Sequence, residues 1–96
     1  MVTSFLMNAA VHIAVRGLVQ GVGFRYYVAR HAAQLNLRGY VKNLYNGDVE
    51  IVAEGDRGSI EMLIKEVKGG PRSAQVSDCL IEWVNSDNSF KGFEIR

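Results

Sequence analysis

The chain has 96 residues, of which 48% are hydrophobic, and eleven basic against ten acidic side chains leave a net charge near +1. This length predicts a single domain, residues 1–96, and the balanced charge argues against a nucleic-acid backbone or an anionic membrane as a partner. No apolar run approaches the roughly 20 residues that a membrane span requires.

The single cysteine, Cys79, excludes an intramolecular disulfide, and with no secretory signature at the start of the chain it indicates a cytoplasmic protein. Cys79 lies in an apolar strand pattern and is expected to be a small buried hydrophobic residue, not a nucleophile. Residues 1–8 precede the first clear pattern and are expected to form a flexible lead-in. Nothing indicates an obligate oligomer, so a monomer is expected.

Apolar residues alternate from Val11 to Val15, which predicts a strand that ends at Gly17. From Phe24 the apolar residues recur at helical spacing, which predicts a helix that ends near Asn36. Its aromatic side chains and His31 are read as packing and surface residues, not as a base-stacking platform or a catalytic base.

Between this strand and this helix, residues 17–25 have the glycine-rich sequence GLVQGVGFR. Glycine adopts φ > 0 at little cost, so successive N–H groups can turn inward and form an anion-binding nest. The following helix N-terminus adds free N–H groups, and Arg25 adds a planar cation suited to two oxygens of one phosphate. The residues alone predict a phosphate site or, as the alternative, a strand-to-helix turn without a ligand.

Two common phosphate motifs are excluded at this stretch. A P-loop requires a lysine followed by Ser or Thr, and a Rossmann fingerprint requires a glycine where Tyr26 stands. No cluster of His, Cys, Asp or Glu has the spacing of metal ligands, so no metal is expected.

Two further strands are predicted at residues 40–45 and 48–54, joined by Asn46-Gly47, a strong hairpin signal. This turn fixes the register and therefore the direction of Asn43. Asp48, Glu50 and Glu54 are expected on the solvent face of the second of these strands, which Gly55 closes.

Asp56 is the predicted N-cap of a second helix, which carries an apolar stripe from Ile60 to Val67 and stops at Gly69-Gly70-Pro71. A strand follows at residues 74–83, where Val76 is out of phase with the later apolar residues and predicts a bulge. A short last strand is expected within residues 90–95. The order βαββαβ, with this last strand appended, predicts an α+β, ferredoxin-like sandwich: an antiparallel sheet with two helices packed on one face.

The glycine-rich stretch, followed by Gly39-Tyr40-Val41-x-Asn43 and Gly47-x-Val49-Glu50, resembles the acylphosphatase family. Gly69-Gly70-Pro71 and the closing Phe93-x-Ile95 also fit, so the resemblance runs from about Val11 to the C-terminus. The departure is Asn36, where relatives often have glycine.

This resemblance implies a small cytosolic hydrolase that cleaves acyl phosphates into a carboxylate and inorganic phosphate without a metal or another cofactor. It also implies the roles of individual residues. Arg25 is the catalytic arginine that binds phosphate, and Asn43 positions the attacking water. The phosphate loop is the backbone of Gln20, Gly21, Val22, Gly23 and Phe24.

Two alternatives remain open from the sequence. RNA-binding modules share this topology, but they stack bases on aromatic residues of a central strand, and residues 48–53 are acidic and lack an aromatic side chain. The other is a non-catalytic acylphosphatase-like domain that binds phosphate or carbamoyl phosphate, similar to the N-terminal part of a hydrogenase-maturation carbamoyltransferase.

Overall fold

The computed structural model of the protein describes residues 8–96. The predicted lead-in falls on residues 1–7, which lie outside this range, and on Asn8, which already begins the first strand. The described elements are β1 (Asn8–Leu18), α1 (Phe24–Gln34), β2 (Arg38–Asn43), β3 (Val49–Asp56), α2 (Arg57–Gly69), β4 (Gln75–Val84) and β5 (Phe93–Ile95). No helix among them is long and apolar enough to cross a membrane.

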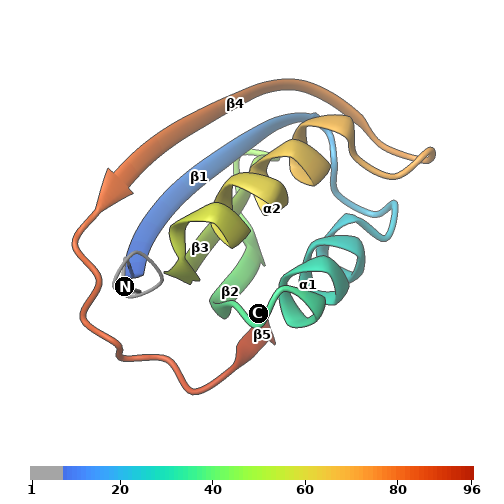
Figure 1. Ribbon diagram of the computed structural model, residues 1–96. Helices are drawn as coiled ribbons and strands as arrows, with labels where there is room; N and C mark the ends of the chain where they lie inside the picture. The colour runs from blue at the N-terminus through green and yellow to red at the C-terminus, as the bar shows by residue number, and fades with distance from the viewer. Residues whose placement is uncertain (1–7) are drawn as a thin grey trace.

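The strands form one sheet in the order β4-β1-β3-β2-β5, and both helices lie on the same face of it (Figure 1). This arrangement confirms the predicted ferredoxin-like α+β fold. The sheet differs from the prediction at one edge, because β5 pairs with β2 in parallel and makes the sheet mixed. Residues 85–92 allow this pairing, since they carry the chain from β4 at one edge to β5 at the opposite edge, and a parallel pair needs such a crossover.

The core lies between the sheet and the helices. Val11, Ile13 and Val15 of β1 stand opposite Ala53, Ile51 and Val49 of β3, and all six side chains are fully buried. They pack against the helix residues Phe24, Val28, Ala32, Ile60, Leu63 and Val67. The strand and helix periods read from the sequence therefore identify the buried faces correctly.

The predicted hairpin turn is present and sets the position of Asn43. The N–H of Gly47 donates to the Leu44 carbonyl at 3.2 Å, and the N–H of Leu44 donates to the Asp48 carbonyl at 2.9 Å. Asn43 is consequently the last β2 residue in the ladder, paired with Val49. Because alternate residues share a face, its side chain lies on the same helix-covered face as Val41.

Several element ends differ from those predicted. Gly55 lies inside β3, which continues to Asp56, the residue that caps α2 by accepting a hydrogen bond from the Ser59 N–H at 3.1 Å. At the end of α1, Asn36 has φ 57°, a left-handed conformation that suits glycine and that Asn tolerates. The predicted bulge is confirmed, because the register between β1 and β4 shifts between Arg16 and Gly17.

The outer face of the sheet is less solvated than predicted. Glu54 is only 2% exposed, because the 85–92 segment covers it: Ser86 Oγ donates to its Oε2 at 3.1 Å, and Arg38 Nε lies 3.8 Å from Oε1. The expectation of a solvent-facing Glu54 is therefore wrong. The neighbouring Glu50 is bonded to His12 Nε2 at 2.8 Å, and this hydrogen bond lowers the pKa of the Glu50 carboxyl.

Cys79 is partly buried on β4, not fully buried as expected. This burial raises the pKa of its thiol, so the neutral form is favoured and a nucleophilic role remains disfavoured.

The structure gives Gly17 a packing role. Its φ is 130°, and a Cβ at this position would lie 2.1 Å from the Gln75 carbonyl oxygen of β4. We expect Gly17→Ala to lower the free energy of unfolding by about 2–4 kcal/mol, because the residue must strain its backbone and push β4 away. Urea denaturation measures this. The control is Gly92→Ala, where a Cβ meets nothing within 4 Å, and equal effects of the two substitutions would contradict the packing role.

Candidate active site

The loop between β1 and α1, residues 19–24, is called the glycine loop here. Val19 and Phe24 are each 1% exposed, so both ends of the loop are anchored in the core. Between them, Gly21 and Gly23 have φ of 75° and 77°, the left-handed region that glycine adopts without a steric cost. This is the backbone conformation that an anion-binding nest of loop N–H groups requires.

The N-terminus of α1 has no side-chain cap. Gly23 occupies the N-cap position, no side chain accepts a hydrogen bond from the first turn, and that turn contains no acidic residue. In α2 the equivalent position is filled by Asp56, whose carboxylate accepts from Ser59. The positive end of α1 is therefore open to an external anion.

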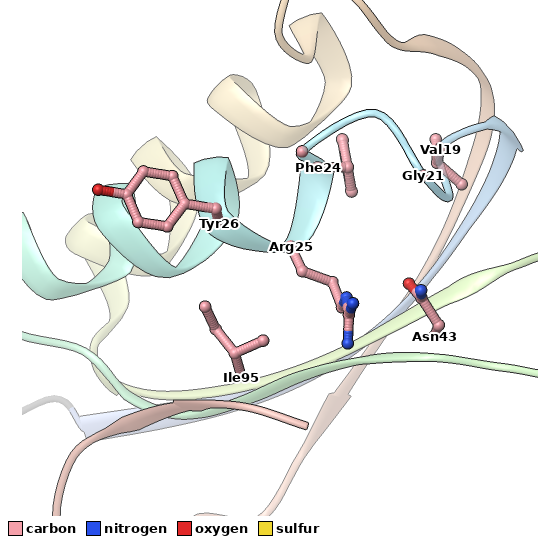
Figure 2. Close-up of a pocket in the computed structure, with 8 residues that line it drawn as sticks. Val19, Gly21, Phe24, Arg25, Tyr26, Asn43 and Ile95 are labelled. Atoms are coloured by element: carbon pink, nitrogen blue, oxygen red, sulfur yellow. The ribbon is translucent and has the colours of Figure 1, made fainter.

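Arg25 projects from the first turn of α1 toward the end of β5. Its Nη1 donates to the main-chain oxygen of Arg96 at 2.8 Å, and Figure 2 shows the guanidinium between Asn43 and Ile95. No Asp or Glu side chain among residues 8–96 forms an ion pair with it. A main-chain oxygen at the end of the sheet thus orients the guanidinium, and the other guanidinium N–H groups have no acidic side chain as a partner among these residues.

Asn43 faces the guanidinium from the end of β2, with its amide directed toward the glycine loop (Figure 2). Its Oδ1 is buried and has no hydrogen-bond partner in the described part of the chain. Buried polar atoms are nearly always hydrogen-bonded in folded proteins. An unpaired carbonyl oxygen at this position can accept a hydrogen bond from a water molecule or a ligand.

These groups meet in one cavity of about 260 Å³. Of the residues predicted for the site, the structure brings Gly21, Gly23, Phe24, Arg25 and Asn43 to its wall, but not Gln20 or Val22. It adds three residues that were not predicted: Val19, Tyr26 and Ile95. None of the lining residues carries a carboxylate, an imidazole, a thiol or an amine. The cavity is therefore equipped to bind an anion, and the Tyr26 hydroxyl is its one side chain of a type that can act as a general acid or base.

Gln20 was expected to act through its backbone, but its side chain also makes contacts that support the loop. Its side-chain Nε2 donates to the carbonyl oxygens of Leu44 at 2.7 Å and of Asp48 at 2.8 Å. These two carbonyls belong to the hairpin that follows Asn43. The amide of Gln20 therefore ties the glycine loop directly to the segment that positions Asn43.

Ser73 holds the other side of the glycine loop. Its Oγ donates to the Val22 carbonyl at 2.8 Å from the connection between α2 and β4. In a planar trans peptide the C=O and the next N–H point in opposite directions, so this bond directs the N–H of Gly23 away from Ser73. The sequence shows no signal for this contact, because Ser73 is distant in sequence and has no motif of its own.

Comparison with known proteins gives a consistent result. A family model described as Acylphosphatase matches residues 11–95. An acylphosphatase of Caldanaerobacter subterraneus subsp. tengcongensis is 45% identical over 89 residues, which cover 93% of this chain and 99% of the relative. An acylphosphatase structure from Coxiella burnetii matches with a TM-score of 0.90 and 40% identity, and covers all of both chains.

A larger solved protein also contains this fold. The crystal structure of full-length HypF in its phosphate- and nucleotide-bound form matches with a TM-score of 0.86 and 34% identity. The match covers 94% of the present chain but only 12% of HypF.

The hydrogen bonds of Gln20 lead to a test. We expect Gln20→Glu to weaken the binding of inorganic phosphate at least tenfold, because a carboxylate facing two carbonyl oxygens loses both bonds and repels them. Isothermal titration with phosphate measures the change. Gln34→Glu, at an exposed position on α1, is the matched control and should bind phosphate within about twofold of the wild type. Wild-type affinity in Gln20→Glu would show that the tie to the hairpin does not shape the loop.

Proposed function

The chain belongs to the acylphosphatase family and has that activity, and we propose that it acts without a metal, with Arg25 and Asn43 as its catalytic residues. The substrate is an acyl phosphate, and the products are a carboxylate and inorganic phosphate. The observation that carries the proposed roles is the convergence of the Arg25 guanidinium, the glycine loop and the unpaired Asn43 Oδ1 on one cavity.

Arg25 and the glycine loop bind the phosphoryl group. The guanidinium retains N–H groups beyond the one that Arg96 accepts, and its fork suits two oxygens of one phosphate. The backbone N–H groups from Gln20 to Phe24 supply further donors at the positive end of α1. Together they stabilise the charge on the non-bridging oxygens in the transition state, where a preorganised site lowers the barrier most.

Asn43 positions the water that attacks phosphorus. Its Oδ1 can accept a hydrogen bond from that water, but an amide cannot take a proton from it. In the proposed step, the water oxygen forms a bond to phosphorus while the bond from phosphorus to the acyl oxygen breaks. The carboxylate leaves with the electron pair, and a phosphate oxygen accepts the proton of the water.

The composition of the cavity supports a metal-free reaction. A carboxylate is a weak base and leaves without protonation, so no general acid is needed. Phosphoryl transfer passes through a loose transition state, in which positioning and charge stabilisation account for most of the catalysis. Arg25 and the loop N–H groups provide that charge stabilisation, whereas none of the residues that line the cavity has a carboxylate, imidazole or thiolate side chain to anchor a magnesium or zinc ion.

The alternatives are not favoured. The relatives named acylphosphatase match over nearly their whole length, whereas HypF matches over a small part of its own. The non-catalytic phosphate- or carbamoyl-phosphate-binding domain is therefore the less favoured function, and an RNA-binding module gives no reason for an unpaired Asn43 oxygen beside the guanidinium. We further propose that the enzyme is a cytoplasmic monomer; its single cysteine allows no intramolecular disulfide, which suits a reducing compartment.

Substitutions of the two catalytic residues should affect phosphate binding and turnover differently. We expect Arg25→Gln to abolish both phosphate binding and turnover, because it removes the cation that binds the dianion. Asn43→Ala should lower kcat by about 10²-fold or more while inhibition by inorganic phosphate changes by less than about threefold.

Steady-state hydrolysis of benzoyl phosphate, with phosphate as a competitive inhibitor, separates these effects. Arg72→Gln and Asn85→Ala, both at exposed positions, serve as matched controls. A wild-type kcat in Asn43→Ala would remove the water-positioning role.

The metal-free proposal predicts that a chelator has no effect. After dialysis against EDTA, the release of phosphate from benzoyl phosphate should stay within about 20% of the untreated rate. Added Mg²⁺ should not raise it, because Arg25 and the loop N–H groups supply the charge that a metal would otherwise provide. Turnover that is lost with EDTA and restored by a divalent cation would contradict the mechanism.

A further inference from the structure

Two exposed apolar side chains border the cavity beside Arg25. Tyr26 is 65% exposed on the first turn of α1, and Ile95 is 48% exposed at the end of β5. Both line the same cavity as Arg25 and Asn43, and neither belongs to the phosphate-binding groups. Figure 2 shows them on the side of the guanidinium that is remote from Asn43.

The geometry of phosphoryl transfer indicates what binds on this side of the cavity. The attacking and leaving oxygens lie roughly in line on opposite sides of phosphorus. If Asn43 holds the water on one side of a phosphate bound to Arg25, the acyl oxygen must leave on the other side. That direction leads to Tyr26 and Ile95.

We propose that Tyr26 and Ile95 bind the acyl group, and that the enzyme favours acyl phosphates with an aromatic or bulky apolar acyl group. This inference rests on the proposed roles of Arg25 and Asn43. An aromatic ring lying on Tyr26 and Ile95 removes apolar surface from water and gains a contact between rings. An acetyl group is too small to cover both side chains.

The Tyr26 ring has a cationic neighbour on the same helix. The Arg30 guanidinium lies 5.9 Å from the centroid of the Tyr26 ring, within the range of a cation–π contact. Ile95 is fixed by its strand, because it pairs with Val41 of β2 and the following residue, Arg96, donates its N–H to the Val41 carbonyl at 2.8 Å. The apolar surface is thus formed before the substrate arrives, which reduces the entropy lost on binding.

A third exposed aromatic residue offers a matched control. Tyr45 lies at the tip of the hairpin, and its side chain is fully exposed. It borders a neighbouring cavity that is also lined by Gln20, Lys42 and Asn43, and that does not include Arg25. In-line attack assigns this cavity to the side of the entering water, so Tyr45 should not contact the acyl group.

The test compares kcat/KM for benzoyl phosphate and acetyl phosphate in the full chain. We expect Tyr26→Ala and Ile95→Ala each to lower the value for benzoyl phosphate about fivefold to tenfold, and the value for acetyl phosphate at most about twofold. Tyr26→Phe should retain the wild-type preference, because the ring and not the hydroxyl makes the contact. Tyr45→Ala should leave the ratio of the two substrates unchanged.

Inhibition by inorganic phosphate monitors the phosphate site in every variant. An unchanged substrate ratio in both Tyr26→Ala and Ile95→Ala, with normal phosphate inhibition, would overturn the assignment of the acyl site while leaving the proposed function intact. A ratio that changes only in Tyr45→Ala would place the acyl group on the other side and overturn the inference. If the wild-type protein hydrolysed neither substrate, the proposed function would fail and this inference with it.

Discussion

The attachment of the glycine loop to the rest of the fold is the constraint on which the site depends. The loop has two glycines in the left-handed conformation. Without its attachments, it could adopt many other backbone conformations, because glycine is conformationally permissive. Its ends are fixed by the burial of Val19 and Phe24, and its middle by hydrogen bonds that involve Gln20 and Ser73. Since these contacts come from the core, the hairpin and the α2–β4 connection, the loop is ordered only when the whole domain is folded.

The site also concentrates positive charge that no acidic side chain of residues 8–96 neutralises. The N-terminus of α1 lacks the carboxylate cap that α2 has, and Arg25 is oriented by a main-chain oxygen of Arg96 and not by an acidic side chain. A cap or an ion pair here would add about 1 kcal/mol of stability, but it would occupy the donors that phosphate needs. The unpaired Oδ1 of Asn43 follows the same principle. Within residues 8–96, these groups lack side-chain partners at the site, whereas the equivalent N-terminus of α2 is capped by Asp56.

The sequence predicts the fold well where one local pattern decides the outcome. The alternation from Val11 to Val15, the apolar stripe of α2, the cap at Asp56 and the turn at Asn46-Gly47 all appear as predicted. The parallel pairing of β5 and the burial of Glu54 could not be predicted in this way, because both depend on the course of residues 85–92 across the sheet. For the site, the motif places Arg25 and Asn43 in one cavity, but the contacts of Gln20, Ser73, Tyr26 and Ile95 arise from tertiary packing that no local pattern records.

The position of a bound phosphate decides whether Arg25, the glycine loop and Asn43 act together. A crystal structure of the protein with inorganic phosphate should show the anion within hydrogen-bond distance of the Arg25 guanidinium and of the N–H groups from Gly21 to Phe24. A water molecule should lie between Asn43 Oδ1 and the phosphorus, on the side opposite Tyr26 and Ile95. A phosphate that binds elsewhere, with the Arg25 guanidinium turned away from the glycine loop, would contradict the account.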